Sequence, residues 1–313
     1  MTFAARLFRP ILEMIDSDYF PEGAEKVRQG PERFEFKRSI PFIILHLGCL
    51  GVLWTGWSWP AVVVAVALYF VRMFAVTAFY HRYFCHRAYR TSRFMQFLFG
   101  LIGLTAVQRG PLWWAAVHRH HHAHSDEEID AHSPIWKGFV WSHIGWLTSS
   151  RNFPTDYRLV RDLAKYPELV FLNRFDLIGP ILLIGMLFGL GAGLEALGVA
   201  TSGWQMVVWG FFISTTVLFH ATCAVNSFAH TLGTKRFETE DESRNSLLLA
   251  LFTLGEGWHN NHHHYQSSAR QGFYWWEVDI SYYLIRLMAC LGIVWDVKTV
   301  PARVYEDAPR SRR

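Results

Sequence analysis

Charged residues are scarce in this sequence. Of its 313 residues only 18% are Asp, Glu, Lys or Arg, whereas 51% are hydrophobic and 16% aromatic. This composition is too apolar for an average soluble protein and favours a lipid bilayer as the solvent. The net charge of +4 is small, and no dense basic stripe interleaves with aromatic residues. We therefore expect no nucleic-acid binding.

Cysteines are also few. The four cysteines form no CxxC pair, so neither a disulfide framework nor a Cys-rich zinc module is indicated. Cys85 lies in a histidine-rich segment, where we interpret it as a small space-filling residue. The first 38 residues lack an apolar run followed by a small-residue cleavage site, so we expect no secretory signal there. Their mixed charges predict an amphipathic arm near the lipid surface.

Long apolar runs are abundant, and two pairs of them predict four membrane-spanning helices. About 20 residues at a helical rise of about 1.5 Å cross a hydrocarbon core of about 30 Å. The first pair turns tightly at residues 57–60, where tryptophans fit an interfacial belt. The four runs are residues 39–59, 60–79, 177–198 and 204–225.

Three shorter apolar segments do not reach spanning length. Residues 94–107 and 246–254 are interpreted as re-entrant, interfacial or cap-packing helices, and each leads into a histidine cluster. Residues 282–295 are predicted to form an amphipathic helix lying on the membrane.

The distribution of basic residues predicts the topology. Of the 30 Lys and Arg residues, 29 lie in the N-terminal arm 1–38, the middle block 80–176 or the tail 226–313. The positive-inside rule places these three segments, and both termini, in the cytoplasm. The sequence thus predicts one functional domain: an all-α integral membrane protein with transmembrane hairpins at 39–79 and 177–225 and a cytoplasmic helical cap.

Two polar side chains interrupt the first hairpin. Arg72 carries a full charge within an apolar run, and we expect it to form a structural ion pair. His46 has no evident partner in the sequence and is interpreted as a tolerated polar residue.

Histidines gather where apolar runs become polar. The clusters are HRYFCH at 81–86, HRHHH at 118–122 and HNNHHH at 259–264, and NSFAH at 226–230 forms a fourth junction. Residues three and four apart share a helix face, so three imidazoles of HRHHH point the same way. A solvated polar run would explain one cluster alone. Four such junctions favour a metal site.

Nine of these histidines are candidate ligands, which is too many for one ion and suits two. A structural zinc ion usually has four ligands, and imidazoles without thiolates suit zinc, iron, copper or nickel. Two redox metals beside helices that could enclose an apolar chain suggest O₂ activation against a C–H bond. The candidates are His81, His86, His118, His121, His122, His230, His259, His262 and His263.

These segments resemble the membrane fatty acyl desaturases, specifically the Δ9 acyl-CoA and acyl-lipid branch that includes the stearoyl-CoA desaturases. HRYFCH, HRHHH, NSFAH and GEGWHNNHH stand in that family's order, and the resemblance covers about residues 39–295. It extends to HSDEEIDAHSP at 124–134, SHIGWL at 142–147 and SRN at 243–245. The stretch HNNHHHYQSSARQGF is more similar to bacterial than to animal members, so we expect a bacterial inner-membrane protein.

The resemblance implies a di-iron enzyme that uses O₂ and two external electrons to install a cis double bond in a saturated acyl chain, commonly between carbons 9 and 10. It implies two iron ions, which zinc can replace in a purified form. The chain would be carried on CoA or a lipid, with acyl carrier protein less favoured. The electrons would come from a ferredoxin, rubredoxin or cytochrome b5 type carrier with its reductase.

The same resemblance assigns roles to single residues. The nine histidines would bind iron, and Asn226 would reach one metal through a water molecule. Gln108, Trp114 and Thr222 match positions that line the acyl tunnel, although Trp114 would serve equally as an interfacial anchor. Further histidines are excluded as ligands or interpreted as supporting or structural residues: His120, His264, His124, His132, His143 and His220.

Carboxylates and arginines near the clusters are assigned more loosely. Asp126, Glu127, Glu128 and Asp130 are interpreted as a solvated loop or as hydrogen-bond partners of ligand histidines. Ala116 and Val117 stand where the acyl-CoA enzymes of animals have a basic residue near CoA. Three other cations are open candidates for phosphate: Arg151, Arg158 and Arg161.

Two other functions fit the same clusters. Similar histidine boxes serve membrane di-iron hydroxylases and alkane monooxygenases, which would yield a hydroxylated product. A non-catalytic membrane protein with structural zinc would leave the lipids unchanged.

Overall fold

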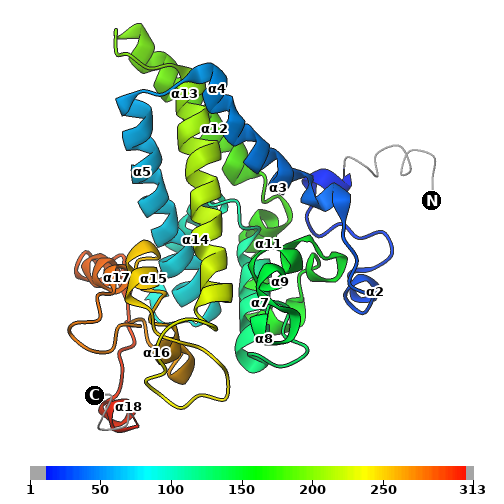
Figure 1. Ribbon diagram of the computed structural model, residues 1–313, viewed down its shortest axis with the longest axis vertical. Helices are drawn as coiled ribbons and strands as arrows, with labels where there is room; N and C mark the ends of the chain where they lie inside the picture. Colours follow the sequence, from blue (N-terminus) through cyan, green and yellow to red (C-terminus); the bar gives the residue numbers. More distant parts are fainter. Residues whose placement is uncertain (1–11, 308–313) are drawn as a thin grey trace.

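The computed structural model describes residues 12–307 and is built almost entirely from helices (Figure 1). Long helices stand side by side in the upper part of the view, and shorter helices and loops gather at their lower ends. Strands β1 (Arg90–Thr91) and β2 (Val294–Trp295) form a short antiparallel pair. The prediction of an all-α protein is confirmed.

Four helical segments are long and apolar enough to cross a membrane. They confirm the two predicted hairpins, and the second and fourth segments, of 27 and 26 residues, exceed the roughly 20 that a bilayer requires. The segments comprise α3 (Phe36–Gly48), η1 (Cys49–Gly51) and α4 (Val52–Thr55); α5 (Trp59–Phe74) and η2 (Ala75–Cys85); α12 (Ile178–Ala196); and α13 (Gly203–Met206), η6 (Val207–Ile213) and α14 (Ser214–Phe228).

Serine caps begin the returning helix of each hairpin. Ser58 Oγ accepts a hydrogen bond from the amide of Ala61, with Pro60 in the first turn, where a missing N–H costs nothing. Ser202 caps α13 in the same way. Ser58 also donates to Thr201 Oγ1 at 3.0 Å, so the two turns contact each other. The tight turns expected from sequence therefore also join the hairpins at the end opposite the cap.

The cap is made of short helices on both sides of the lower ends of α5 and α14 (Figure 1). The short run at 94–107 becomes α6, the run at 246–254 becomes α15, and α17 ends at Cys290, so the predicted helix at 282–295 is wrong beyond that residue. The cap elements are α2 (Ala24–Arg28), α6 (Arg93–Leu104), α7 (Pro111–Ala123), α8 (Pro134–Lys137), α9 (Phe139–His143), η3 (Gly145–Thr148), η4 (Ser150–Asn152), η5 (Tyr157–Val160), α10 (Arg161–Ala164), α11 (Pro167–Arg174), α15 (Leu247–Phe252), α16 (His259–His264), α17 (Ile280–Cys290) and α18 (Ala302–Glu306).

The predicted ion pair of Arg72 is wrong. Its side chain is 1% exposed, and within residues 12–307 no carboxylate lies within ion-pair distance of it. It donates instead to neutral oxygens: the hydroxyls of Ser214 and Thr215 and the carbonyls of Leu68, Thr105 and Gly210. Five acceptors from three helical regions satisfy the guanidinium without a counter-ion, which ties α5 to α14 and to the end of α6.

His46 does have partners, contrary to expectation. Its Nε2 lies 3.0 Å from Nε2 of His220 on α14, and Nδ1 of His220 lies 3.1 Å from Nε2 of His143 on α9. Because His220 directs its two nitrogens to opposite neighbours, one ion could not bind all three rings. The three hydrogen-bonded histidines therefore connect α3, α14 and the cap, which is consistent with a structural role for His143 and His220.

Candidate metal centre

Four elements carry the candidate ligands to one place. Helix η2 continues α5 and ends at Cys85, directly before His86. Helix α14 ends at Phe228, shortly before His230. Helices α7 and α16 carry the other two boxes. Segments far apart in the chain therefore meet at the junction of spans and cap.

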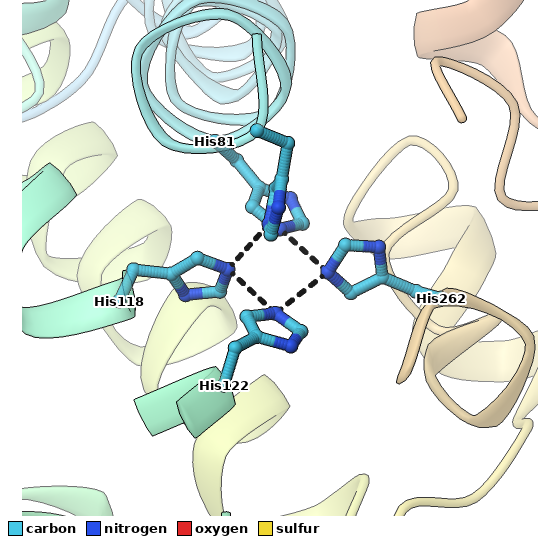
Figure 2. Close-up of side chains that lie close together, drawn as sticks. His81, His118, His122 and His262 are labelled. Carbon is cyan, nitrogen blue, oxygen red and sulfur yellow. Dashed lines mark hydrogen bonds between the residues drawn. The ribbon is translucent and has the colours of Figure 1, made fainter. Parts of the chain in front are cut away.

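The first cluster contains five histidines whose ring nitrogens face one another. Figure 2 shows His118, His122 and His262 turned toward a common centre. The Nε2 atoms of His118 and His122 are 3.0 Å apart, and those of His122 and His262 are 2.9 Å apart. The other two members, His81 and His86, contact His262 and His118 at 3.0 and 2.9 Å. The cluster consists of His81, His86, His118, His122 and His262.

The second cluster lies beside the first. Nε2 of His230 is 2.9 Å from Nε2 of His259. The rings of His122 and His263, one from each cluster, are 4.4 Å apart between centroids. Nε2 of His263 is buried with no hydrogen-bond partner among the described residues, which suits a metal ligand. The cluster consists of His121, His230, His259 and His263.

The spacing of the nitrogens in the first cluster is short enough for them to share one metal ion. Two imidazoles bound at about 2.1 Å and 90° from each other have nitrogens about 3.0 Å apart, whereas tetrahedral ligands have them about 3.4 Å apart. The spacings of 2.9–3.0 Å in the five-histidine cluster match the first arrangement. The two groups of nitrogen donors fit two metal ions, and imidazole donors suit iron and zinc alike.

Burial keeps most of these rings neutral. It lowers the pKa of His118, His122, His259 and His262 well below the usual 6.5. It also lowers the pKa of His263 to about 4, although Asp241 opposes the shift. Neutral imidazoles have a free lone pair, so these histidines are ready to bind a metal ion at neutral pH.

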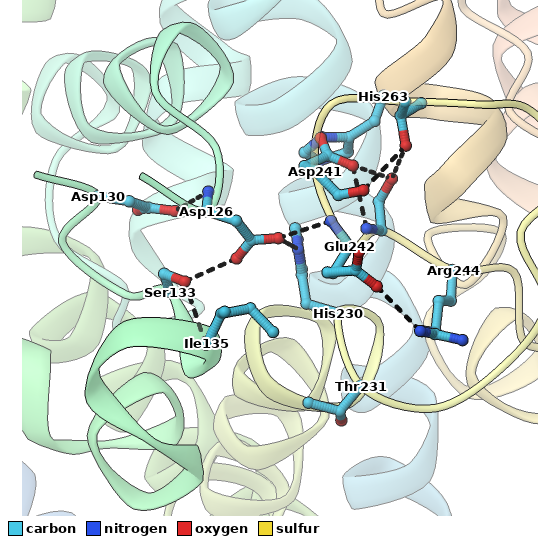
Figure 3. A network of polar contacts seen from close by, with 12 residues as sticks. Asp126, Asp130, Ser133, Ile135, His230, Thr231, Asp241, Glu242, Arg244 and His263 are labelled. Atoms are coloured by element: carbon cyan, nitrogen blue, oxygen red, sulfur yellow. Dashed lines mark hydrogen bonds and ion pairs between the residues drawn. The ribbon is translucent and has the colours of Figure 1, made fainter. Parts of the chain in front are cut away.

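Carboxylates hold the opposite edges of several ligand rings. Asp130 accepts from Nδ1 of His121 at 2.9 Å, and Asp126 accepts from Nδ1 of His230 at 2.8 Å. Figure 3 shows Asp126 between the loop before α8 and the segment around Glu242. Asp126 also accepts a hydrogen bond from the backbone amide of Glu242. These contacts place both aspartates among the hydrogen-bond partners of candidate ligands. Such contacts orient the ring and raise its basicity toward a metal.

Two further carboxylates support ligands but were not predicted from the sequence. Asp241 accepts from Nδ1 of His263, and Glu256 pairs with Nδ1 of His81. Glu256 also binds the buried Arg82, which is held by Asp279 as well. Glu256 was recognisable as a single carboxylate three residues before a histidine box. Asp241 lies in a charged loop that resembles any solvated segment, so only the fold reveals its role.

The histidines excluded from the ligand set lie outside both clusters. His264 pairs with Asp307 and stacks on Phe237, and His124 binds Glu127. His132 lies beside His121, whose ring centroid is 4.4 Å away, and its Nδ1 is 3.7 Å from Asp130. Asn226 lines the neighbouring cavity, and its carbonyl accepts from Ser142.

A cavity lies against the candidate metal centre. Its wall includes His81, His118, His121 and His259 together with residues of α3 such as Phe42 and Leu45. The three predicted acyl-site residues all line it and are hydrogen-bonded to one another. Gln108 donates to Thr222 Oγ1 at 2.9 Å, and Trp114 Nε1 donates to Gln108 Oε1 at 3.4 Å. Trp114 also stacks on His118 at 5.0 Å, so it belongs to the cavity wall.

The comparison with protein families decides the identity of the chain. A family described as "Fatty acid desaturase" matches residues 57–287, well over half of the sequence. The chain belongs to this family. The desaturase is therefore an oxidoreductase that acts on fatty acyl chains, and its apolar helices are those of an integral membrane protein.

Curated relatives agree with this family and differ in specificity. The desaturase is 38% identical to an acyl-CoA 5-desaturase of Anemone leveillei over 93% of this chain and 91% of the relative. It is 38% identical to the sn-1 stearoyl-lipid 9-desaturase of Anabaena variabilis over 82% of this chain and 91% of the relative. It is 35% identical to Delta-9 acyl-lipid desaturase 1 of Arabidopsis thaliana over 85% of this chain and 84% of the relative. Both acyl-CoA and acyl-lipid enzymes are thus among its relatives.

Proposed function

We propose that the protein introduces a cis double bond, at position 9, into a saturated acyl chain carried on CoA or a lipid. The reaction would use O₂, two iron ions and two electrons from a separate ferredoxin, rubredoxin or cytochrome b5 type carrier with its reductase. The observation that carries the proposal is the meeting of nine histidines in two clusters, four of which line a cavity with many apolar side chains. The names of the 9-desaturase relatives support the position.

The proposed ligands are the nine clustered histidines, with Asn226 acting through a water molecule. When bound, two iron ions would supply the O₂-dependent oxidation that removes hydrogen from the chain. The nine histidines would divide into groups of five and four nitrogen donors, one group for each ion. Zinc could replace iron in a purified form, because imidazole binds both metals.

The residues of the chain would hold and shield the substrate. The cavity wall presents apolar side chains such as Met73, Val76 and Phe219 next to the histidines. Burial in such a wall excludes water and limits the chain to a few positions, and a fixed position brings one carbon within reach of the oxidant. Gln108, Trp114 and Thr222 form a polar contact at this wall, and we propose that it sets the path of the acyl chain.

The proposed topology follows from the charge distribution. The arm 1–38, the block 80–176 and the tail 226–313 would lie in the cytoplasm of a bacterium, with hairpins 39–79 and 177–225 in its inner membrane. All nine proposed ligands would then face the compartment that holds soluble electron carriers.

The experiment is the fatty-acid profile of a host that lacks its own desaturase. We expect new cis-9 monounsaturated chains with the wild type and with His264→Ala, and none with His118→Ala. His118 belongs to the five-histidine cluster, whereas His264 lies outside both clusters. Hydroxylated chains would instead indicate a hydroxylase. An unchanged profile, despite bound iron and a supplied electron carrier, would contradict the proposal for ordinary acyl chains.

A further inference from the structure

A buried arginine lies where three parts of the cavity wall meet. Arg72 is 1% exposed and does not itself line the cavity. Its helix, α5, stands beside α14 in Figure 1. The three parts are the residues that follow Arg72 in the chain, the loop between α6 and α7, and α14. Their side chains on the cavity are those of Met73, Val76 and Thr77, of Val107 and Gln108, and of Phe219 and Thr222.

The hydrogen bonds of Arg72 join the same three parts. Nε donates to a carbonyl of its own helix at 3.1 Å. Nη1 donates to the carbonyl of Thr105 at 3.2 Å and to Thr215 Oγ1 at 2.5 Å. Nη2 donates to the carbonyl of Gly210 at 3.2 Å and to Ser214 Oγ at 2.7 Å. A guanidinium carries its donors in a rigid planar fork, so these bonds fix the distances between the segments.

The acceptors of Arg72 have few alternatives. Thr105 is the C-cap of α6, and the last carbonyls of a helix have no partner within it. Thr215 is fully buried, and Ser214 already donates its own proton to the carbonyl of Ala65 at 2.7 Å. Inside a membrane-spanning segment no water replaces a lost donor. Arg72 therefore keeps the end of α6 in place against α14.

The loop that begins at Thr105 has a strained backbone. Val107 and Arg109 have positive φ angles of 58° and 68°, a region that residues other than glycine rarely occupy. Such strain persists only where surrounding contacts hold it. Arg72 supplies one of these contacts at the start of the loop.

A different arginine anchors the end of the loop. Arg109 donates to Asp176 at 3.2 Å, and it shares the carbonyl of Ser17 with Arg38. The loop is thus fixed on both sides of Gln108, the residue that it presents to the cavity.

Gln108 marks a defined point on the cavity wall. It donates to Thr222 Oγ1 at 2.9 Å and accepts from Nε1 of Trp114, which stacks on His118 of the five-histidine cluster. Thr222 lies about two helical turns after Thr215, the hydroxyl partner of Arg72. The two segments that Gln108 and Thr222 join at the cavity are therefore the two that Arg72 joins behind it.

We propose that Arg72 is a positioning residue that determines which carbon of the acyl chain lies at the candidate metal centre. This inference rests on the proposed function and names a residue that sets the position of oxidation. Arg72 acts through the loop and α14, because it does not reach the cavity. A displacement of about 1 Å at a reacting centre changes a rate by up to about 100-fold. Neighbouring methylenes of an acyl chain differ in position by a distance of that order.

The first test is the position of oxidation in a host without its own desaturase. Arg72→Lys keeps the charge but loses the planar fork, so one ammonium replaces contacts to three segments. We expect the ratio of neighbouring positional isomers to the main product to rise by roughly tenfold. The matched control is Arg93→Lys, because Arg93 begins α6 and pairs with Glu168 at its exposed face. It should keep the wild-type ratio, and a wild-type ratio in folded Arg72→Lys would overturn the proposal.

A second comparison separates positioning from general support of the fold. A purely structural role would lower the yield and the melting temperature without changing the isomer ratio. If Arg72 acts through Gln108, Arg72→Lys should add no further shift to a Gln108→Leu protein. An additive shift in the double variant would overturn the proposed route.

An apolar replacement covers the case in which Arg72→Lys does not fold. Arg72→Met/Ser214→Ala/Thr215→Val removes the guanidinium together with the two hydroxyls that it binds, and buried polar groups are often replaced this way without loss of stability. We expect the isomer ratio to rise in this variant too. A wild-type ratio would overturn the proposal.

The position of the bound chain is also measurable without turnover. The probes are methyl stearates with two bromine atoms near the carboxyl end, at carbons 9 and 10, or near the methyl end, and bromine quenches tryptophan fluorescence at short range. Subtracting the signal of a Trp114→Phe protein isolates Trp114 at the cavity wall. We expect Arg72→Lys, but not Arg93→Lys, to change which probe quenches Trp114 most strongly.

The quenching pattern distinguishes this inference from the proposed reaction. The same pattern in the wild type and in folded Arg72→Lys would overturn the role of Arg72. A changed pattern in a protein that makes no oxidised product would support that role and contradict only the proposed reaction.

Discussion

At the scale of single residues, neighbouring histidines have different partners. His118 and His122 are four residues apart and enter the five-histidine cluster, whereas His121 between them enters the other. His262 and His263 are adjacent and also divide between the clusters. One turn of helix therefore contributes to two sites, because the clusters lie side by side and successive residues differ in direction by about 100°.

Asp241, whose carboxylate accepts a hydrogen bond from Nδ1 of His263, offers a test at this scale. Asp241→Asn removes the charge that polarises the ring while keeping the size of the side chain. We expect metal affinity to fall by about 10–100-fold, as for other supporting carboxylates. Metal retained per protein after dialysis against graded chelator measures the effect.

Asp307→Asn is the matched control, because Asp307 pairs with His264 outside both clusters. Its metal content should equal that of the wild type. Equal retention by Asp241→Asn and wild type would contradict a supporting role for Asp241.

At the scale of elements, close packing limits which residues α12 can contain. A Cβ added at Gly179 would lie 2.4 Å from Cβ and 2.6 Å from the carbonyl carbon of Leu104, at the end of α6. A Cβ added at Gly185 would meet nothing within 4 Å. The glycine-rich sequence of this span thus combines close backbone contacts at Gly179 and Gly191 with positions such as Gly185 where no other atom lies nearby.

We expect Gly179→Ala to destabilise the protein by about 1–3 kcal/mol, since the backbone of Leu104 must move to accept the methyl group. Gly185→Ala should be neutral or stabilise by up to about 1 kcal/mol, because alanine favours the helix. Thermal unfolding of the two variants in the same detergent measures the difference. Equal melting temperatures would contradict the packing of α6 on α12.

At the scale of the whole molecule, the candidate metal centre contains several histidines whose burial keeps them neutral. In the metal-free protein, burial holds the pKa of His86, His118, His122, His259 and His262 well below 6.5. At His121 burial lowers the pKa, but Asp130, Asp126 and Asp241 together outweigh it and raise the pKa, so that residue contributes in the opposite direction. The five lowered groups outnumber it and determine the sign.

The metal-free protein should therefore lose stability as the pH falls below 6.5. The unfolded chain takes up protons there while the buried rings do not, down to the pKa of about 4 of His263. Melting temperatures of chelator-treated protein between about pH 7 and about pH 5 measure this. A melting temperature that stays constant or rises over that interval would contradict the burial of neutral histidines.

Much of this protein was determined by its sequence alone. Apolar runs of spanning length and the separation of 29 basic residues from them specify two hairpins, because bilayer thickness and charge act locally along the chain. The nine histidines were identifiable because each box stands at an apolar junction. The helical periodicity then predicts which imidazoles of one box share a face of the helix.

Only the tertiary structure decided which groups meet. It assigned Asp241 to His263, Glu256 to His81, five neutral oxygens to Arg72 and a shared carbonyl to Arg38 and Arg109. These partners lie on segments that pack together from distant parts of the chain. Their selection depends on where helices cross and which buried donors need an acceptor, and no local pattern of residues contains that information.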